Sequence, residues 1–380
     1  MSGTGARLGD LVTFLSGYAF RSQAFNSEGD GLPLVRIRDV VTGRSNTFYS
    51  GPFDDRFLVV DGDYLIGMDG EFNLARWRGG RALLNQRVCK IDQVSPLLDR
   101  HYLARFLPAA LKKIEDATPF VTVKHLSVKD LNEVVIPVPP LAEQRRIAEA
   151  LDRADELRAK RREALAHVDD LIQPIFLEMF GNRRTILTGW PTTTLGELLD
   201  FLTSGSRGWA AHYADRGDLF LRIQNVRGGE LLLEDVAYVQ APDTAEARRT
   251  RVQPGDVLLS ITADLGRTAV VPNDLGTAFI NQHLSIIRCS KLDPAFLSAY
   301  LSSPAGQDQI LRRNRQGVKA GLNFDDVRAV IVPYPPRALQ VEYAKRVAAV
   351  RQLRSRHRAS MAELDALFAA LQDRAFQGLL

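Results

Sequence analysis

The chain has 380 residues, enough for about two domains that each bury a core of their own. Its 45% hydrophobic and 25% charged residues and its two cysteines fit a globular protein of the reducing cytoplasm, and no apolar run reaches the roughly 18 residues of a membrane-spanning helix. The net charge is +4, with 17 basic and 16 acidic side chains in each of the ranges 1–140 and 181–336. Binding of DNA would therefore require basic side chains gathered on one face or positive charge supplied by another subunit.

The sequence repeats itself. Residues 135–140 (VIPVPP) return at 331–336 (IVPYPP), and residues 82–91 (ALLNQRVCKI) return at 278–287 (AFINQHLSII), in both cases 196 positions later. Repeats of this size are whole domains, not the short units of solenoids. The chain is therefore expected to consist of two similar halves, with a partner of two-fold character such as duplex DNA.

Each half predicts short strands and turns first. We interpret residues 34–38 (LVRIR) and 219–223 (LFLRI) as segments with a two-residue period, which predicts strands. Turns are predicted at Gly62-Asp63 and Gly255-Asp256, each followed by an apolar strand. Within the globular halves, helices are predicted over residues 102–114 and 295–301.

A long helix is predicted after each Pro-Pro pair. Apolar side chains recur at alternating steps of three and four residues, which is typical of a coiled-coil seam. The first seam consists of Ile147, Leu151, Ala154, Arg158, Arg161, Leu165, Val168, Ile172, Ile175 and Met179. The second lies 196 positions later: Tyr343, Val347, Val350, Arg354, His357, Met361, Leu364, Phe368, Leu371 and Ala375. Two separate amphipathic helices, each packed on its own domain, are the alternative.

The connection between the halves predicts the direction of these helices. The second domain begins near Thr194, soon after the first helix ends, so the second helix can pair with the first only by running back. The helices are therefore expected to be antiparallel and related by a pseudo-two-fold axis. Pro174 lies off the seam and is expected to kink the end of the first helix.

This series of features resembles the specificity subunit of type I restriction–modification systems. The residues that carry the resemblance are 137–144 (PVPPLAEQ), 178–181 (EMFG), the two Gly-Asp turns, Asn85-Gln86 and Asn281-Gln282. The second copy departs from the pattern at Leu339, where the first has Glu143, so the start of the second helix is not explained by the motif.

The resemblance implies an α+β protein with two target-recognition domains, each followed by a long helix of an antiparallel coiled coil. The expected boundaries are 1–140 and 182–336 for the recognition domains and 141–181 and 337–380 for the helices. Each domain would read one half of a bipartite, asymmetric sequence in double-stranded DNA. Two methyltransferase subunits and the restriction subunits would be the protein partners and would use S-adenosylmethionine, ATP and magnesium, while this chain would hold no cofactor.

The sequence favours a non-catalytic role directly. None of the nine lysines has an acidic residue two positions before it, as a nuclease core requires, and neither Pro-Pro pair stands in an Asn/Asp-Pro-Pro-aromatic methyltransferase motif. Neither a phosphate-binding glycine loop nor Cys/His metal-ligand spacing occurs. A single-chain methyltransferase or nuclease, and a protein scaffold with incidental DNA binding, remain the alternatives.

The predicted strands suggest base-reading residues. In an ideal strand Arg36 and Arg38 would face away from the core, as would Arg222 and Gln224 in the second copy. Arginine reads guanine and glutamine reads adenine in the major groove. Arg38 and Gln224 are preferred because they differ between the copies, whereas Arg36 and Arg222 could equally form a structural ion pair in each domain.

Further candidates for DNA binding lie in loops and one basic run. The loop residues are Arg76, Arg78, Lys124, Arg207, Arg267 and Lys319, and the run is Arg312, Arg313 and Arg315. The run suits phosphate contacts or, alternatively, a solvated helix surface. Trp77 and Trp209, next to these arginines, could be core residues or groove contacts.

Apolar residues outside the seams suggest a protein interface. They are Leu157, Leu171, Leu177, Leu353 and Leu367. Because a two-stranded coiled coil covers a narrow stripe, these side chains are expected to be buried against a partner. The resemblance implies that this partner is a methyltransferase subunit.

Overall fold

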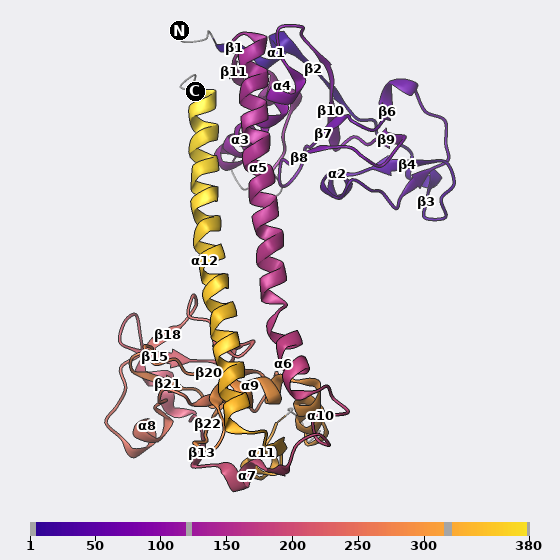
Figure 1. Ribbon diagram of the computed structural model, residues 1–380. Helices are drawn as coiled ribbons and strands as arrows, with labels where there is room; N and C mark the ends of the chain where they lie inside the picture. The colour runs from indigo at the N-terminus through magenta and orange to yellow at the C-terminus, as the bar shows by residue number, and fades with distance from the viewer. Residues whose placement is uncertain (1–4, 119–123, 315–320, 378–380) are drawn as a thin grey trace. The chain divides into compact units, whose positions relative to one another are not determined.

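The computed structural model describes residues 5–118, 124–314 and 321–377. Contacts within the chain divide it into two units. Unit 1 comprises residues 1–162 and 359–380, and unit 2 comprises residues 163–358. Each unit therefore combines a globular domain with pieces of both long helices (Figure 1). In the described ranges, no helix is long and apolar enough to cross a membrane.

Unit 1 contains short strands, short helices and one longer domain helix. The strands are β1 (Gly5–Arg7), β2 (Val12–Ser16), β3 (Phe25–Asn26), β4 (Leu32–Val35), β5 (Phe48–Tyr49), β6 (Leu58–Val59), β7 (Tyr64–Gly67), β8 (Leu74–Arg76), β9 (Ala82–Leu84), β10 (Val88–Val94) and β11 (Val135–Pro137). The helices are α1 (Leu8–Leu11), η1 (Ser22–Ala24), α2 (Ile37–Thr42), η2 (Asp55–Phe57), α3 (Arg100–Ala117), α4 (Val128–Glu133), most of α5 (Leu141–Asp169) and the end of α12 (Arg337–Phe376).

Unit 2 contains a similar series. Its strands are β12 (Thr192–Thr194), β13 (Phe201–Ser204), β14 (Tyr213–Ala214), β15 (Asp218–Leu221), β16 (Val226–Arg227), β17 (Glu230–Leu231), β18 (Ala237–Val239), β19 (Val257–Ser260), β20 (Thr268–Val270), β21 (Ala278–Ile280), β22 (Leu284–Arg288) and β23 (Ile331–Pro333). Its helices are α6 (Ile172–Phe180), α7 (Leu195–Leu198), η3 (Gly208–His212), η4 (Ile223–Asn225), α8 (Ala245–Thr250), α9 (Pro294–Ser302), α10 (Pro304–Arg312), α11 (Phe324–Arg328), the end of α5 and the first part of α12.

The two units share one strand order. Sheet β2-β10-β7-β8 of unit 1 corresponds to β13-β22-β19-β20 of unit 2, and the pair β1-β11 corresponds to β12-β23. Two further sheets, β3-β5-β4-β9-β6 and β14-β18-β15-β21, both contain a parallel contact, β4 with β9 and β15 with β21, among antiparallel ones, and unit 2 also has the antiparallel pair β16-β17. The fold therefore mixes helices and sheets, and the duplication seen in the sequence is a duplication of structure.

Most of the predicted domain elements are present. The Gly62-Asp63 and Gly255-Asp256 turns precede β7 and β19, and both glycines have the positive φ that such turns require, 97° and 82°. The predicted helices at 102–114 and 295–301 lie within α3 and α9. The strands predicted over residues 34–38 and 219–223 are wrong in their second halves, because β4 ends at Val35 and β15 ends at Leu221.

The long helices begin in the same way despite the substitution at Leu339. In each, a backbone carbonyl of the second proline, Pro140 or Pro336, accepts the first helical hydrogen bonds. The buried glutamine that follows ties the helix to its domain: Gln144 accepts from the Asp99 amide, and Gln340 accepts from the Asp293 amide at 2.8 Å. Glu143 makes a surface ion pair with Arg146, so its loss at Leu339 leaves the helix start intact.

The first long helix is interrupted where proline predicts it. α5 ends at Asp169 and α6 begins at Ile172, so the break lies at residues 170–171 and Pro174 is the third residue of the new helix. Proline has no N–H to donate to the carbonyl four residues earlier, here that of Asp170. Placing Pro174 in the first turn of a new helix removes the need for that bond. The predicted kink is thus a break between two helices, whereas α12 is continuous over 40 residues.

Within each unit, the pieces of the two long helices run antiparallel. In unit 1, Ile147 and Leu151 share a core with Ala375, and the Arg158 guanidinium lies 2.6 Å from the Asp365 carboxylate. In unit 2, the ring of Tyr343 lies 5.4 Å from that of Phe180, and Arg354 lies 3.5 Å from Asp169. All twenty predicted seam positions are buried or half-buried, as the heptad pattern requires.

Candidate nucleic-acid interface

Corresponding turns follow β4 and β15. At the end of β4, the backbone N–H of Arg36 donates to the Asp39 carboxylate at 3.0 Å; at the end of β15, that of Arg222 donates to the Asn225 side chain at 2.9 Å. These bonds cap α2 and η4 and turn the chain away from the strand direction. Leu34 and Val35 are both fully buried, so the alternating faces predicted for the strand do not exist there.

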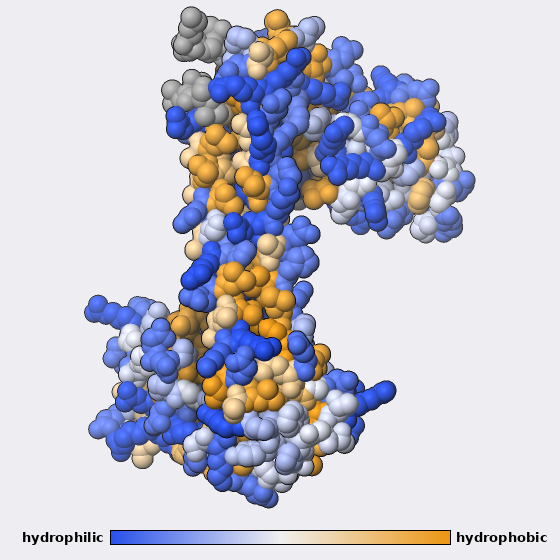
Figure 2. All heavy atoms as spheres, in the orientation of Figure 1, coloured by the Kyte–Doolittle hydropathy of each residue, from blue (hydrophilic) through white to orange (hydrophobic). Residues whose placement is uncertain are grey.

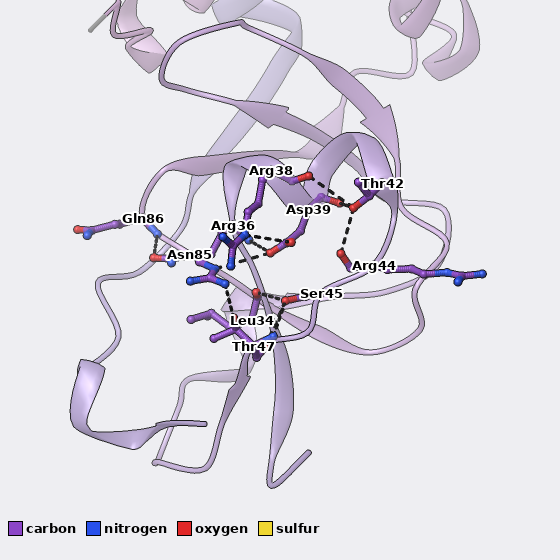
Figure 3. Close-up of polar contacts among 10 residues, drawn as sticks. All are labelled: Leu34, Arg36, Arg38, Asp39, Thr42, Arg44, Ser45, Thr47, Asn85 and Gln86. Carbon is purple, nitrogen blue, oxygen red and sulfur yellow. Dashed lines mark hydrogen bonds and ion pairs between the residues drawn. The ribbon is translucent and has the colours of Figure 1, made fainter. Parts of the chain in front are cut away.

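Arg36 and Arg222 bind to their own domains. Nη2 of Arg36 hydrogen-bonds the Thr47 hydroxyl, and its Nε lies 3.8 Å from the Asp39 carboxylate (Figure 3). Burial raises the pKa of Asp39, while the hydrogen bond from Ser45 and the charge of Arg38 lower it. Arg36 thus supports the fold of its turn, as a structural ion pair would, instead of reading a base.

In the second copy, Asp235 fills the place of these partners. Nη2 of Arg222 donates to the Asp235 backbone carbonyl at 3.1 Å and lies 3.7 Å from its carboxylate. The equivalent arginines therefore make similar contacts with different residues.

Arg38 and Gln224 remain accessible. Each is the second residue of the short helix that follows the strand. The Arg38 side chain is 72% exposed and lies 3.9 Å from Asp39, while exposed Gln224 donates to the Asp235 carboxylate at 2.6 Å. These two residues can present different hydrogen-bonding groups from the same place in the two domains.

The Asn-Gln turns, which the sequence marked as a family motif, lie beside these residues. The backbone N–H of Asn85 donates to the Val35 carbonyl, and the backbone N–H of Asn281 donates to the Leu221 carbonyl at 3.0 Å. The side chain of Gln86 points away from the cluster in Figure 3 and is exposed. Gln86, and by equivalence Gln282, are candidate contacts that the sequence reasoning missed, although their occurrence in both copies was the available signal.

A glycine holds each Asn-Gln turn against the rest of its domain. A Cβ at Gly17 would lie 2.1 Å from the Asn85 carbonyl oxygen, and one at Gly205 would lie 2.1 Å from that of Asn281. Such a separation is far inside van der Waals contact. The close approach therefore requires glycine in both copies and fixes the position of exposed Gln86 and of half-buried Gln282.

The loop around residue 125 joins the same region of unit 1. The Asp69 carboxylate lies 3.1 Å from Arg87 and 2.6 Å from the His125 ring, so it links the Asn-Gln turn to this loop. In unit 2, the Thr262 hydroxyl lies 2.5 Å from the His283 ring and Thr262 forms a β-bridge with Gly321. The arrangement is therefore duplicated with different side chains.

Two loop candidates and one member of the basic run bind to groups of their own domain. Nζ of Lys124 donates to the Glu115 carbonyl at 2.5 Å, and Arg313 donates to the carbonyls of Gln309 and Ala329. Nε of Arg267 lies 2.5 Å from the Asp264 carboxylate. These contacts end helices or close turns, so the three cations are poor candidates for DNA contact.

The other candidates are exposed but scattered. Arg76, Arg78, Arg207 and Arg312 are exposed, and they lie on β8, the turn after it, the start of η3 and the end of α10. Trp77 and Trp209, which flank them, are core residues with 1% and 5% exposure. The remaining two, Arg315 and Lys319, lie outside the described residues.

The amino-acid sequence is similar to a known family of domains and to proteins that contain it. The model of the type I restriction modification DNA specificity domain matches residues 5–167. The chain is 30% identical to the type I restriction enzyme EcoBI specificity subunit of Escherichia coli, covering 89% of this chain and 77% of the relative. It is 23% identical to the EcoKI specificity subunit of Escherichia coli K12, covering 90% and 80%.

Solved structures show the same fold. A chain from a study of complex assembly and conformational transition of the type I restriction–modification system aligns with a TM-score of 0.67 and 20% identity, covering 100% of this chain and 98% of that one. The S subunit from M. genitalium aligns with a TM-score of 0.55 and 18% identity, covering 98% and 96%. The chain belongs to the type I restriction enzyme specificity subunits, the non-catalytic components that recognise the DNA target.

Proposed function

We propose that the chain recognises a bipartite, asymmetric sequence in double-stranded DNA, one half-site with each unit. The observation that carries this proposal is the pair of equivalent turns, which share their capping geometry yet expose Arg38 in one unit and Gln224 in the other. Domains that bind different half-sites should agree where they fold and differ where they contact bases.

In this proposal the long helices pair along their whole length and set the gap between the half-sites. The antiparallel contacts within each unit and the burial of all the seam positions support it. Specificity subunits of type I systems act with methyltransferase and restriction subunits, and those subunits would perform the chemistry with S-adenosylmethionine, ATP and magnesium. The chain itself would hold no cofactor and would act in the cytoplasm.

The test begins with the target sequence. Methylome sequencing of a host that expresses this subunit with its cognate methyltransferase should give one motif with two defined halves and a fixed gap. Arg38→Ala should then relax base discrimination in one half and Gln224→Ala in the other, each by about 1–3 kcal/mol, the value of one bidentate base contact. Methylation rates on duplexes with single base substitutions measure this.

Arg44→Ala is the matched control, because Arg44 is exposed and points away from the Arg36–Asp39 cluster (Figure 3). It should leave base discrimination unchanged. If Arg38→Ala and Gln224→Ala both act on the same half-site, the assignment of one unit to each half is refuted. A host methylome without any bipartite motif would instead favour a protein scaffold with incidental DNA binding.

Exposed leucines on the helices support a protein partner. Leu157, Leu171, Leu353 and Leu367 are 41–63% exposed. In unit 2, apolar side chains gather on the surface over α6 and the neighbouring part of α12 (Figure 2). Leu177 differs from the others, because it is half-buried and packs against the core of unit 2. We propose that the four exposed leucines contact the methyltransferase subunits and that Leu177 stabilises the fold.

Substitution separates these roles. Leu367→Glu and Leu353→Glu should weaken co-purification with the methyltransferase subunit by about tenfold or more, as expected for apolar interface residues. The free energy of unfolding of the isolated chain should change by less than about 0.5 kcal/mol, as for other surface positions. Leu177→Glu, the control, should destabilise the chain. If Leu367→Glu lowers the free energy of unfolding of the isolated chain but leaves complex formation intact, that leucine belongs to the internal core.

A further inference from the structure

A two-stranded hairpin in unit 2 lies against the first part of α12. β16 and β17 are joined by Gly228 and Gly229, whose φ angles of 59° and 80° form a tight left-handed turn. A hairpin of this size is marginally stable by itself, so its position depends on the contacts that it makes with other elements.

Charged side chains make those contacts with α12. Nε of Arg351 lies 2.7 Å from a Glu230 carboxylate oxygen, and its Nη2 donates to the Gly229 carbonyl at 2.9 Å. Nη2 of Arg354 donates to the other Glu230 oxygen, while its Nη1 lies 3.5 Å from the Asp169 carboxylate. One glutamate on the hairpin thus joins two arginines of α12.

These charges are largely removed from water. Side-chain exposure is 28% for Arg351, 22% for Glu230 and 17% for Arg354. Burial lowers the pKa of Arg351, and the charge of Glu230 opposes this effect. A cavity of about 600 Å³ lies beside the cluster, bordered by the hairpin, α9 and α12. Part of the space between hairpin and helix is therefore unfilled, and the charge pairs bridge the two elements beside it.

The hairpin belongs to the segment that presents the candidate reading residue Gln224. Before the hairpin, the Asn225 side chain donates to the Leu232 carbonyl at 2.8 Å, which joins the two ends of the hairpin. After it, Asp235 accepts hydrogen bonds from Gln224 and Arg222. At the tip, the Gly229 amide donates to the Thr268 carbonyl of β20. A displaced hairpin would therefore displace Gln224.

We propose that Glu230 is a positioning residue for DNA recognition by unit 2: by joining Arg351 and Arg354, it fixes residues 222–235, and with them Gln224, on α12. The inference rests on the proposed bipartite recognition and adds the device that holds one of the two reading segments in place. Glu230 touches no base in this account and acts through the placement of Gln224.

The device is particular to unit 2. The residue 196 positions before Arg354 is Arg158, whose guanidinium binds Asp365 of α12 at 2.6 Å. The residue equivalent to Arg351 is Asp155, which has the opposite charge and lies 3.1 Å from Arg105 of α3. Loss of Glu230 should therefore affect the half-site bound by unit 2 and leave the other unchanged.

The experiment uses the complex of this chain with its cognate methyltransferase subunits. Initial methylation rates are measured on duplexes that carry the parental motif, gaps one base pair shorter or longer, or single substitutions in either half. Glu230→Gln should reduce the preference for the parental gap about tenfold, because a partly buried charge pair has lost one partner. It should also lower base discrimination in the half-site that Gln224→Ala affects.

Two comparisons exclude a general defect. Glu234→Gln removes the same charge from an exposed position of the same segment and should keep the parental preference within about twofold, as for other surface positions. Arg351→Met combined with Glu230→Gln should be no worse than Glu230→Gln alone, since coupled residues are not additive. Unchanged gap preference and discrimination in Glu230→Gln, or equal losses in both half-sites, would overturn the inference. A parent without a bipartite motif would instead contradict the proposed function itself.

Discussion

Replacing Arg288 with alanine is expected to lower the free energy of unfolding of unit 2 by about 3–5 kcal/mol, the cost of leaving a buried charge without its partner. Asp256, in the second Gly-Asp turn, is fully buried. Its carboxylate binds Nε and Nη2 of Arg288 at 2.7 and 2.8 Å. It also accepts a hydrogen bond from the backbone N–H of Gln253 at 2.7 Å. Urea unfolding followed by tryptophan fluorescence measures the change.

The first copy of the turn provides the control. Asp63 is 17% exposed, and the nearest Arg100 nitrogen lies 3.8 Å from it. Arg100→Ala should therefore cost about 1 kcal/mol or less, as for other accessible ion pairs. If the two substitutions lower the free energy of unfolding equally, burial does not make the Asp256–Arg288 pair more stabilising than the accessible Asp63–Arg100 pair.

Lengthening both long helices by one heptad is expected to move the recognised gap by about three base pairs, at 3.4 Å per base pair. The insertions belong next to Arg161 and His357, where α5 and α12 pass from one unit to the other. Seven residues add about 10.5 Å of helix at 1.5 Å per residue, and a whole heptad keeps the seam in phase. Both half-site sequences should stay unchanged, as methylome sequencing would show.

An insertion in one helix alone is the control for this prediction. It should place the seams out of step and abolish specific methylation. A base pair also rotates the duplex by roughly a tenth of a turn, so the paired helices would measure phase as well as length. Methylation of the original gap at the parental rate by the doubly lengthened protein would mean that the methyltransferase subunits set the spacing.

Periodic features of the sequence predicted the elements that depend on periodicity. The heptads gave the buried face of α5, α6 and α12, and Pro174 marked the break between the first two. The Gly-Asp pairs gave the turns before β7 and β19. In each case local chemistry decides the structure: a helix buries one stripe, proline lacks a donor, and glycine accepts a positive φ.

The candidate reading residues were predicted for the wrong reason. Leu-Val-Arg-Ile-Arg has the two-residue period of a strand, yet the Asp39 side chain caps the backbone at Arg36 and starts a helix. Asn225 does the same at Arg222. An acidic or amide residue three positions after the cap is a recognisable signal, and it outweighed the apolar pattern. Arg38 and Gln224 are nevertheless exposed, as predicted, because both follow the turn by two residues.

Contacts between distant segments could not be inferred from one sequence. Lys124 and Arg313 donate hydrogen bonds to backbone carbonyls near helix ends, where positively charged side chains are stabilising. The pairing of Glu230 with Arg351 and Arg354 joins positions more than 120 residues apart. Neither pattern nor composition distinguishes such side chains from exposed cations available to a phosphate.

The division of unit 1 between residues 1–162 and residues 359–380 has a consequence for biosynthesis. Unit 2 is continuous in the chain, so all of its residues leave the ribosome before the last piece of unit 1. Until then Tyr102 and Phe106 lack their contact with Phe376, and Ile147 and Leu151 lack Ala375. Domains otherwise fold in the order of their synthesis. In this subunit the domain that is made first is completed after the second one, and a nascent chain exposes an apolar surface until the end of α12 is released.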